Sequence, residues 1–502
     1  MTPDTATHIH LIACGGTGMG SLAIMLQARG YRVTGSDQHL YPPMSTQLET
    51  AGIEVYEGFD AAHLEPQPDL VVVGNAVTRD NIEATATREA GIPAMSFPQA
   101  LAHFFIQDRH AVVVTGTHGK STTTALIAWL LIHAGYDPSV FVGAVMRNFD
   151  RTFRLGDGDH MVIEGDEYDS AYFDKGPKFL HYRPRTAVLT SLEFDHADIY
   201  RDLDHVRSAF VRFLNLLPDD GCLVACHDQA NVRELLATTP VTAPVQTYGL
   251  EAGAQWQAVD YTPTVHNPGT MHGMSMTILR HGGFYCRLTA PLFGRHNLQN
   301  ILAAVAVATR LGLSAEQIVA GMASFQHIKR RCEIRGVVNE ITVIDDFAHH
   351  PTAVEMTLEG VRLAYPESRL WAVFEPRSAT SRRKVFQQAY VQALRLADYV
   401  LLADVYRGNL LAAADRLSPE ILVQALNPLT KGAWFYADTN DIIAHLCRES
   451  QPSDVILIMS NGGFDNIHER LLAALAKISP TAPGHRPCLR VRPLRSRQSP
   501  RE

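Results

Sequence analysis

A strand that runs into a glycine loop and then into a helix constrains this chain more than any other feature. The segment is VVVTGTHGKSTTT, residues 112–124, and Lys120 and Ser121 stand at its predicted helix start. Glycines let backbone N–H groups converge on phosphate oxygens, while the lysine neutralises charge and the serine hydroxyl can ligate Mg²⁺. The residue five before Gly119 is Val114, so the match is to TGTHGKS rather than to the full GxxxxGK[ST] pattern. The segment predicts a triphosphate site beside a parallel sheet, with an ordinary turn as the alternative.

Apolar strands alternate with helical patterns and divide the chain into three blocks. At 502 residues the chain exceeds what a single core usually covers. The alternation is typical of an α/β fold with open parallel sheets. We expect blocks at 1–108, 109–330 and 331–480, and a disordered tail over 481–502, which is rich in proline and arginine.

The charge balance and the absence of long apolar runs limit the partners. A net charge of −8 with 19% charged residues argues against a dedicated nucleic-acid binder. The N-terminus has no basic signal-like region, and no apolar stretch approaches ~20 residues. Seven scattered cysteines fit reduced thiols. We therefore expect a soluble cytoplasmic protein with neither a nucleic-acid nor a membrane partner.

The first block carries its own glycine turn, CGGTGMG at residues 14–20. Its spacing resembles a dinucleotide fingerprint but does not match GxGxxG, so it is weak evidence for NAD. Asp37 closes the second strand, where an acid can meet a ribose or a base edge. A nucleoside diphosphate ligand is the expectation, and an NAD-dependent oxidoreductase or nucleotide-sensing module is the alternative.

Acidic residues and a histidine follow two predicted strands of the second block. Glu164 opens a run of carboxylates that extends to Asp169, and hard oxygen ligands of this kind suit Mg²⁺ beside phosphates. His196 stands next to Asp195 at another strand end, where we favour a metal or phosphate role over a core position.

Three further patterns complete the candidate chemistry. Asn297 and Asn300 share one helix face, where their amides can hold a base or a phosphate or simply cap the helix. The basic run at 329–336 lies at the expected hinge to the third block, able to reach a transferring phosphoryl group. In the third block, DDFAHHP at 345–351 ends a strand with two acids, and the strand-end arginine of EPRSAT at 375–380 offers a fork for a carboxylate.

Together these motifs resemble the Mur ligase family of ATP-dependent amide-bond formers in peptidoglycan assembly. The likeness spans about 1 to 478, and the motifs follow the family order: GGTGM, TGTHGKSTT, EGDE, DHAD, GRHNLQN, KRR and DDFAHHP. The resemblance implies a three-domain architecture: a Rossmann-like UDP-binding domain, a P-loop ATPase domain and a Rossmann-like domain for the incoming amino component. It also implies ATP and Mg²⁺ as cofactors.

Some stretches are more specific within the family. YPPMST (41–46), EYDSAYFDKGPKF (167–179), LEFDHADIY (192–200), FEPRSAT (374–380) and MSNGGF (459–464) resemble members that join UDP-N-acetylmuramate to the tripeptide L-alanyl-γ-D-glutamyl-meso-diaminopimelate during cell-wall peptide recycling. Extra residues around 172–178 favour a tripeptide over free L-alanine, which is the alternative substrate. Both substrates are small molecules, and we expect a monomer or a weak homodimer.

The residue patterns and the resemblance together imply roles for individual side chains. Catalytic roles fall to Lys120, His196, Arg331 and Asp346, with Asp345 as the less favoured neighbour. ATP binding falls to Gly116, Thr117, His118, Gly119, Lys120, Ser121, Thr122, Asn297 and Asn300. Substrate binding falls to Gly16, Gly18, Met19, Ser36, Asp37, Asn75, Arg377 and Arg382, and metal binding to Ser121, Glu164 and His196.

Two departures from the family pattern affect the metal. Ser121 stands where relatives usually carry threonine, which keeps the hydroxyl. Several relatives use a carbamylated lysine after the DH motif for a second Mg²⁺, whereas residues 201–218 contain no lysine. A carbamylated lysine is therefore not expected to hold a second Mg²⁺ here.

Overall fold

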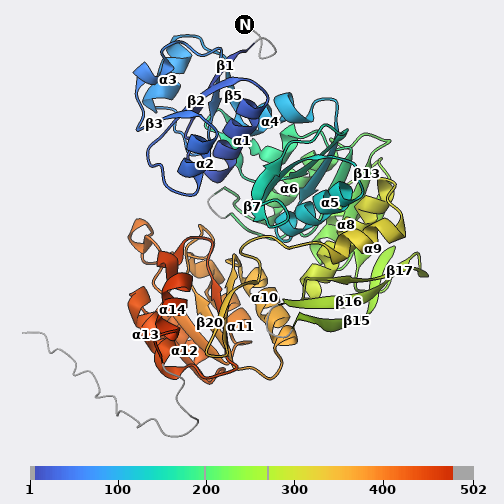
Figure 1. The fold of residues 1–502 in the computed structure, drawn as a ribbon, viewed down its shortest axis with the longest axis vertical. Coiled ribbons are helices and arrows are strands. Elements are labelled where there is room, and N and C mark those ends of the chain that lie inside the picture. Colours follow the sequence, from blue (N-terminus) through green and yellow to red (C-terminus); the bar gives the residue numbers. More distant parts are fainter. Residues whose placement is uncertain (1–5, 197–198, 268–270, 479–502) are drawn as a thin grey trace, which may run out of the picture.

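A computed structural model describes residues 6–196, 199–267 and 271–478 of the chain. The polypeptide forms three α/β units in chain order (Figure 1). The tail expected over 481–502 lies outside the described residues. Among the described residues, no helix combines the length and apolar character needed to cross a bilayer.

The first unit is a five-stranded parallel sheet in the order β3-β2-β1-β4-β5. Its strands β1 and β4 are buried along their whole length, as expected for a sheet covered on both faces. The elements are β1 (His8–Ile12), α1 (Thr17–Ala28), β2 (Arg32–Asp37), α2 (Met44–Thr50), β3 (Glu54–Glu57), η2 (Ala61–Leu64), β4 (Leu70–Val73), α3 (Ile82–Glu89), β5 (Ala94–Ser96), α4 (Phe97–Leu101) and η3 (Ala102–Ile106).

The second unit contains a ten-stranded mixed sheet in the order β17-β16-β15-β14-β13-β12-β6-β9-β7-β8. Its elements are β6 (His110–Thr115), α5 (Lys120–His133), β7 (Ser139–Met146), β8 (Arg151–Arg154), β9 (His160–Glu164), β10 (Asp169–Ala171), β11 (Asp174–Pro177), η4 (Lys178–His181), β12 (Thr186–Leu189), α6 (Leu203–Leu214), β13 (Cys222–Cys226), α7 (Ala230–Thr238), β14 (Val245–Gly249), β15 (Trp256–Asn267), β16 (Met271–Arg280), β17 (Gly283–Ala290), α8 (Arg295–Arg310) and α9 (Ala315–Ala323). Strands β15, β16 and β17 form an antiparallel extension that the strand patterns of this block did not indicate.

The third unit is a six-stranded sheet in the order β18-β19-β23-β20-β21-β22, in which only the β18 to β19 pairing is antiparallel among the described strands. Its elements are β18 (Glu333–Val338), β19 (Ile341–Asp346), α10 (Pro351–Ala364), β20 (Leu370–Phe374), η5 (Lys384–Phe386), α11 (Gln387–Leu394), β21 (Tyr399–Ala403), η6 (Gly408–Leu410), α12 (Pro419–Leu426), β22 (Gly432–Tyr436), α13 (Thr439–Glu449), β23 (Val455–Met459), η7 (Phe464–Asn466) and α14 (Ile467–Leu475).

Apolar packing continues across the boundaries between units. One buried cluster joins the first unit to one face of the central sheet, and another joins the opposite face of that sheet to the third unit. The strand order then determines where polar residues meet. Because β12, β6 and β9 are parallel neighbours, the loops at their carboxyl ends lie side by side. The same holds for β19, β23, β20 and β21 of the third unit.

Candidate active site

A cavity of about 360 Å³ lies between the central unit and the third unit, beside the glycine loop that follows β6. The structure brings many of the residues singled out from the sequence to its wall: Thr117, His118, Gly119, Lys120, Ser121, Thr122, Glu164, His196, Asn297, Asn300, Arg331 and Asp346. Most of them come from loops at the carboxyl ends of β6, β9, β12 and β19 and from the start of α8.

The glycine loop is shaped by close contact with α8. Gly119 has a φ of 81°, and a Cβ at this position would lie 2.4 Å from Asn300 Oδ1. The Asn300 amide donates to Asn297 Oδ1 over 3.1 Å, and Asn300 Oδ1 accepts from the Thr123 hydroxyl at 3.1 Å. Both asparagines are buried. The pair therefore braces the loop, a role that the helix-face pattern alone did not identify.

Lys120, the first residue of α5, is held inside the loop. Its Nζ donates to Gly116 O over 2.7 Å and forms an ion pair with Glu167 at 2.9 Å. Burial lowers the pKa of Lys120, but Glu167 and its acidic neighbours outweigh burial and raise that pKa above its ordinary value. The lysine is therefore a fixed positive charge at the N-terminus of a helix, where backbone N–H groups also favour anions.

His196 shares Glu167 with the lysine. Its Nε2 lies 3.0 Å from Glu167 Oε1, and its ring is buried. Burial lowers the pKa of His196, but the hydrogen bond to Glu167 and the charges of Glu167 and Asp195 together outweigh burial and raise that pKa. The structure thus places Lys120 and His196 around one carboxylate. In the sequence Glu167 is one member of an acidic run, and the pattern does not indicate this position.

Glu164 and Ser121 form a donor set that fits Mg²⁺. The serine hydroxyl donates to Glu164 Oε1 over 2.9 Å, and the Gly143 N–H donates to the other carboxylate oxygen at 2.7 Å. Burial raises the pKa of Glu164. A cation at this oxygen pair would stabilise the charged form of the carboxylate, and a hydroxyl with a carboxylate beside a phosphate loop is a typical ligand combination for this ion.

The third unit contributes a buried acid and an arginine. Asp346, at the end of β19, accepts from the backbone N–H groups of Cys332 and Ala348, each at 2.7 Å. Burial raises the pKa of Asp346, while nearby Arg331 opposes the change. The Arg331 guanidinium lies 5.0 Å from the ring centroid of Phe347. Both charged side chains line the cavity.

Asp345 points to the opposite side of the strand. It lies 3.4 Å from Arg330 and 3.3 Å from His468, and it does not line the cavity. Burial raises the pKa of Asp345, but His468 and two arginines outweigh burial and lower it. The alternation of side chains along a strand separates the two neighbouring acids.

This separation gives a prediction with a built-in control. We expect Asp346→Asn to lower kcat by about a hundredfold, the lower end of what a positioned acid or base contributes. Because the amide has one acceptor oxygen for two backbone N–H groups, it should also lower the free energy of unfolding by about 1–3 kcal/mol. We expect Asp345→Asn to retain activity but to lower the free energy of unfolding by about 2–4 kcal/mol, because it weakens a buried ion pair. Steady-state rates and thermal melts of both variants measure the two effects. Equal kcat losses would contradict the assignment.

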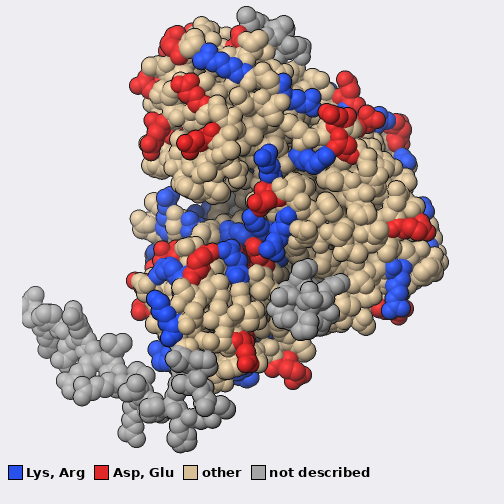
Figure 2. Space-filling view, viewed as in Figure 1, with Lys and Arg blue, Asp and Glu red and all other residues tan. Residues whose placement is uncertain are grey.

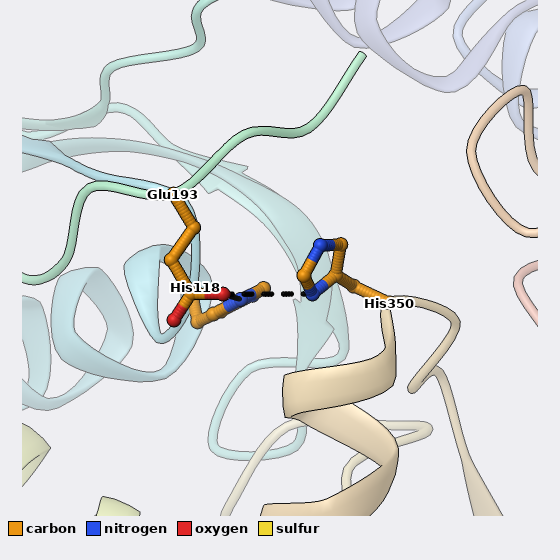
Figure 3. Close-up of side chains that lie close together, drawn as sticks. All are labelled: His118, Glu193 and His350. Atoms are coloured by element: carbon orange, nitrogen blue, oxygen red, sulfur yellow. Dashed lines mark hydrogen bonds and ion pairs between the residues drawn. The ribbon is translucent and has the colours of Figure 1, made fainter. Parts of the chain in front are cut away.

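Glu193 connects His118 of the glycine loop to His350 and Thr352 of the third unit (Figure 3). Glu193 Oε2 lies 3.4 Å from His118 Nε2 and 3.7 Å from His350 Nδ1, and it accepts from the Thr352 hydroxyl at 2.7 Å. Burial lowers the pKa of His350 to about 4, so the ring is neutral at pH 7. Its Nδ1 accepts from the Thr352 N–H at the start of α10.

Burial raises the pKa of Glu193, but its hydrogen bonds and nearby histidines outweigh burial and lower that pKa to about 2. The charged carboxylate therefore links the loop to the third unit. Glu193 is absent from the residues expected from the sequence. Its position after a buried strand, two residues before the DH pair, is the signal that could have found it.

The expected substrate residues of the first unit lie apart from this cavity. Asp37 accepts from the Gly15 N–H at 2.7 Å and so fixes the glycine turn after β1. Gly16 and Asn75 are exposed, whereas Met19 is buried. Ser36 is also fully buried, and its hydroxyl donates to Glu83.

The two arginines expected to bind substrate lie in the third unit. Arg377 and Arg382 follow β20 and do not line the cavity. The same loop does reach the cavity, because the Thr380 hydroxyl donates to Asp195 and accepts from the His196 N–H at 3.3 Å.

The fold consists of three α/β units, and the glycine loop of the central unit faces a charged strand end of the third unit. This arrangement defines a multidomain nucleotide-dependent enzyme. Family models match the chain in the same order. The Mur ligase family catalytic domain matches residues 8–109, the Mur ligase middle domain 114–308, and the Mur ligase glutamate ligase domain 330–462. One relative is 39% identical to this chain over 93% of the chain's length. The chain belongs to the Mur ligase family.

Individual members of the family are similar to this chain over nearly its whole length. The UDP-N-acetylmuramate–L-alanyl-γ-D-glutamyl-meso-2,6-diaminoheptandioate ligase of Escherichia coli K12 is 39% identical over 93% of this chain and 98% of its own length. The UDP-N-acetylmuramate–L-alanine ligase of Acetivibrio thermocellus is 31% identical over 94% and 97%. The crystal structure of a murein peptide ligase from Psychrobacter arcticus aligns with a TM-score of 0.69 at 38% identity, covering 94% of this chain and 99% of that one.

Proposed function

We propose that this chain is an ATP-dependent ligase that joins UDP-N-acetylmuramate to L-alanyl-γ-D-glutamyl-meso-diaminopimelate in the recycling of cell-wall peptides. The observation that carries the proposal is the cavity in which Lys120 faces Arg331 and Asp346 from the third unit. The higher identity to the tripeptide-using relative than to the alanine-using one supports the choice of amine.

The first chemical step follows from the poor reactivity of a carboxylate. The lactyl carboxylate attacks the γ-phosphorus of ATP, the bond to the bridging oxygen breaks, and ADP leaves with its electron pair. Lys120 and His196 stabilise the charge that develops on the phosphoryl oxygens. Ser121 and Glu164 would hold Mg²⁺, which supplies further charge neutralisation when bound.

The second step uses the third unit. The tripeptide amine attacks the acyl phosphate, and inorganic phosphate leaves as the amide bond forms. Asp346 orients the amine, and its raised pKa suits it to accept the proton that the amine loses. Arg331 faces the same space and stabilises the departing phosphate. The contact of Glu193 with Thr352 keeps the units together and water out while the acyl phosphate exists.

UDP-N-acetylmuramate binds the first unit in this proposal, with the sugar acid directed towards the cavity. Gly16 and, in the first turn of α1, Gly18 and Met19 bind the diphosphate. Asp37 at the end of β2 and Asn75 after β4 contact the nucleoside from the two sides of β1. Ser36 contributes through its backbone, since its hydroxyl is already engaged. The blocks 1–108, 109–330 and 331–480 serve as the UDP-sugar, ATP and peptide domains.

A coupled assay of ADP release tests the proposal directly. The purified chain with ATP, Mg²⁺ and UDP-N-acetylmuramate should release ADP rapidly with the tripeptide and at least about a hundredfold more slowly with free L-alanine. Faster turnover with L-alanine would replace the proposal with an alanine ligase. No ADP release with either amine would reject both ligase assignments.

A further inference from the structure

Tyr406, just after β21, contacts three arginines of the third unit, two through its ring and one through its backbone carbonyl. The Arg377 guanidinium carbon lies 3.7 Å from its ring centroid, and the Arg407 guanidinium carbon lies 5.3 Å from it. The Tyr406 carbonyl accepts from Arg382 Nη1 at 3.4 Å. Arginine stacks on aromatic faces while its N–H groups stay available at the edge of its plane. Tyr406 therefore orients the guanidinium group of Arg377 without consuming its hydrogen-bond donors.

The opposite side of Arg377 is closed by the loop after β23. A Cβ at Gly462 would collide with Arg377 Nε, so any larger residue here would displace the guanidinium from its present position. Arg330 fixes this loop by donating to Ser460 O at 2.7 Å and Gly462 O at 2.8 Å. The Gly462 N–H in turn donates to Ser460 Oγ at 2.9 Å. Arg377 is thus enclosed between an aromatic ring and a braced backbone.

The charges of this cluster are poorly balanced within the protein. Within the described part of the chain, Arg377 has one carboxylate partner, Glu375 at 3.4 Å, and that carboxylate also accepts from Ser460. Arg382 and Arg407 have no carboxylate within 4.0 Å among the same described residues. Lys and Arg side chains also gather around the hollow between the first and third units (Figure 2). An anionic ligand would neutralise the remaining positive charge of these three arginines.

We propose that Tyr406 is the positioning residue of a polycarboxylate-binding subsite, in which Arg377, Arg382 and Arg407 bind carboxylates of the incoming peptide. The inference rests on the proposed function. The tripeptide carries one free carboxylate on its γ-linked glutamyl residue and two on diaminopimelate, far from the reacting amine. Binding at these groups selects the peptide over free L-alanine and directs its N-terminus towards the cavity that the Thr380 loop reaches.

The test varies the tripeptide at saturating ATP and UDP-N-acetylmuramate. Tyr406→Ala should raise the tripeptide KM about tenfold, since stacking of a partly buried cation is worth about that factor, and should leave kcat within about threefold and the KM for ATP unchanged. Tyr406→Phe keeps the ring and should behave as wild type. Gly462→Ala should raise the same KM by displacing Arg377. Tyr436→Ala, an aromatic substitution on β22 beside His445, is the matched control and should leave the peptide KM unchanged.

A modified peptide separates carboxylate binding from general loosening of the unit. With the glutamyl and both diaminopimelate carboxylates amidated, Tyr406→Ala and wild type should differ in KM by less than about threefold, because the groups that the arginines bind are gone. An unchanged tripeptide KM in Tyr406→Ala overturns the inference, as does equal damage by Tyr406→Phe or an undiminished effect with the amidated peptide. If wild type is inactive with the unmodified tripeptide, the proposed function itself fails instead.

Discussion

We expect Lys120→Ala to reduce ADP formation by at least about a thousandfold, which is the largest effect predicted for any single substitution in this chain. The lysine is the one cation that the glycine loop itself supplies, and its Nζ is fixed by Gly116 and Glu167. Preorganised charge at a phosphoryl group contributes on this scale because the site is shielded from water. UDP-N-acetylmuramate binding should persist, since the residues expected to bind it lie on the first unit. Single-turnover ADP formation and calorimetric titration measure the two properties.

A lysine outside the site serves as the control for this variant. Lys431 is 61% exposed and pairs with Asp398 in the third unit, so Lys431→Ala should keep wild-type turnover. Removing Lys120 also takes an ion-pair partner from the buried Glu167, so a thermal melt should accompany the rates. Retained turnover in a folded Lys120→Ala enzyme would refute the assigned role.

The sequence predicted the local elements of this site well because each has a strong short-range cause. The apolar run before the glycine loop forms β6, and the lysine that follows it starts α5. Glu164 ends β9, as its position after an apolar run indicated. Parallel order then brings these strand ends together, which is a general property of α/β sheets rather than of these residues.

What the sequence could not supply is the orientation of side chains across long separations. The sequence pattern gives no reason to prefer Asp345 or Asp346, since both end the same apolar run. Which of them faces the cavity is decided by the register of β19 between β18 and β23. The meeting of Glu193 with Thr352 depends on how two units pack, and no local periodicity encodes it. The same reason explains why Arg377 was visible as a strand-end arginine while its partner Tyr406, 29 residues later, was not.

Glu164→Gln has the second largest expected effect, a loss of about a hundred- to a thousandfold in kcat together with a higher Mg²⁺ requirement. The amide keeps the shape of the side chain and can still accept from Ser121 or Gly143, so folding should be retained. It lacks the negative charge that a divalent cation needs from a hard oxygen ligand. A Mg²⁺ titration of the ADP-release rate therefore separates metal binding from packing.

The matched control for this variant is an exposed glutamate of the same unit. Glu234 is 58% exposed and pairs with Arg207, so Glu234→Gln should show the wild-type Mg²⁺ dependence. Raising the Mg²⁺ concentration should recover part of the rate of Glu164→Gln but none of the loss in Lys120→Ala, because only the first substitution weakens the metal site. A Glu164→Gln enzyme with an unchanged Mg²⁺ midpoint would show that this carboxylate acts on the reaction in another way, and the pairing of Ser121 with Glu164 would then be structural.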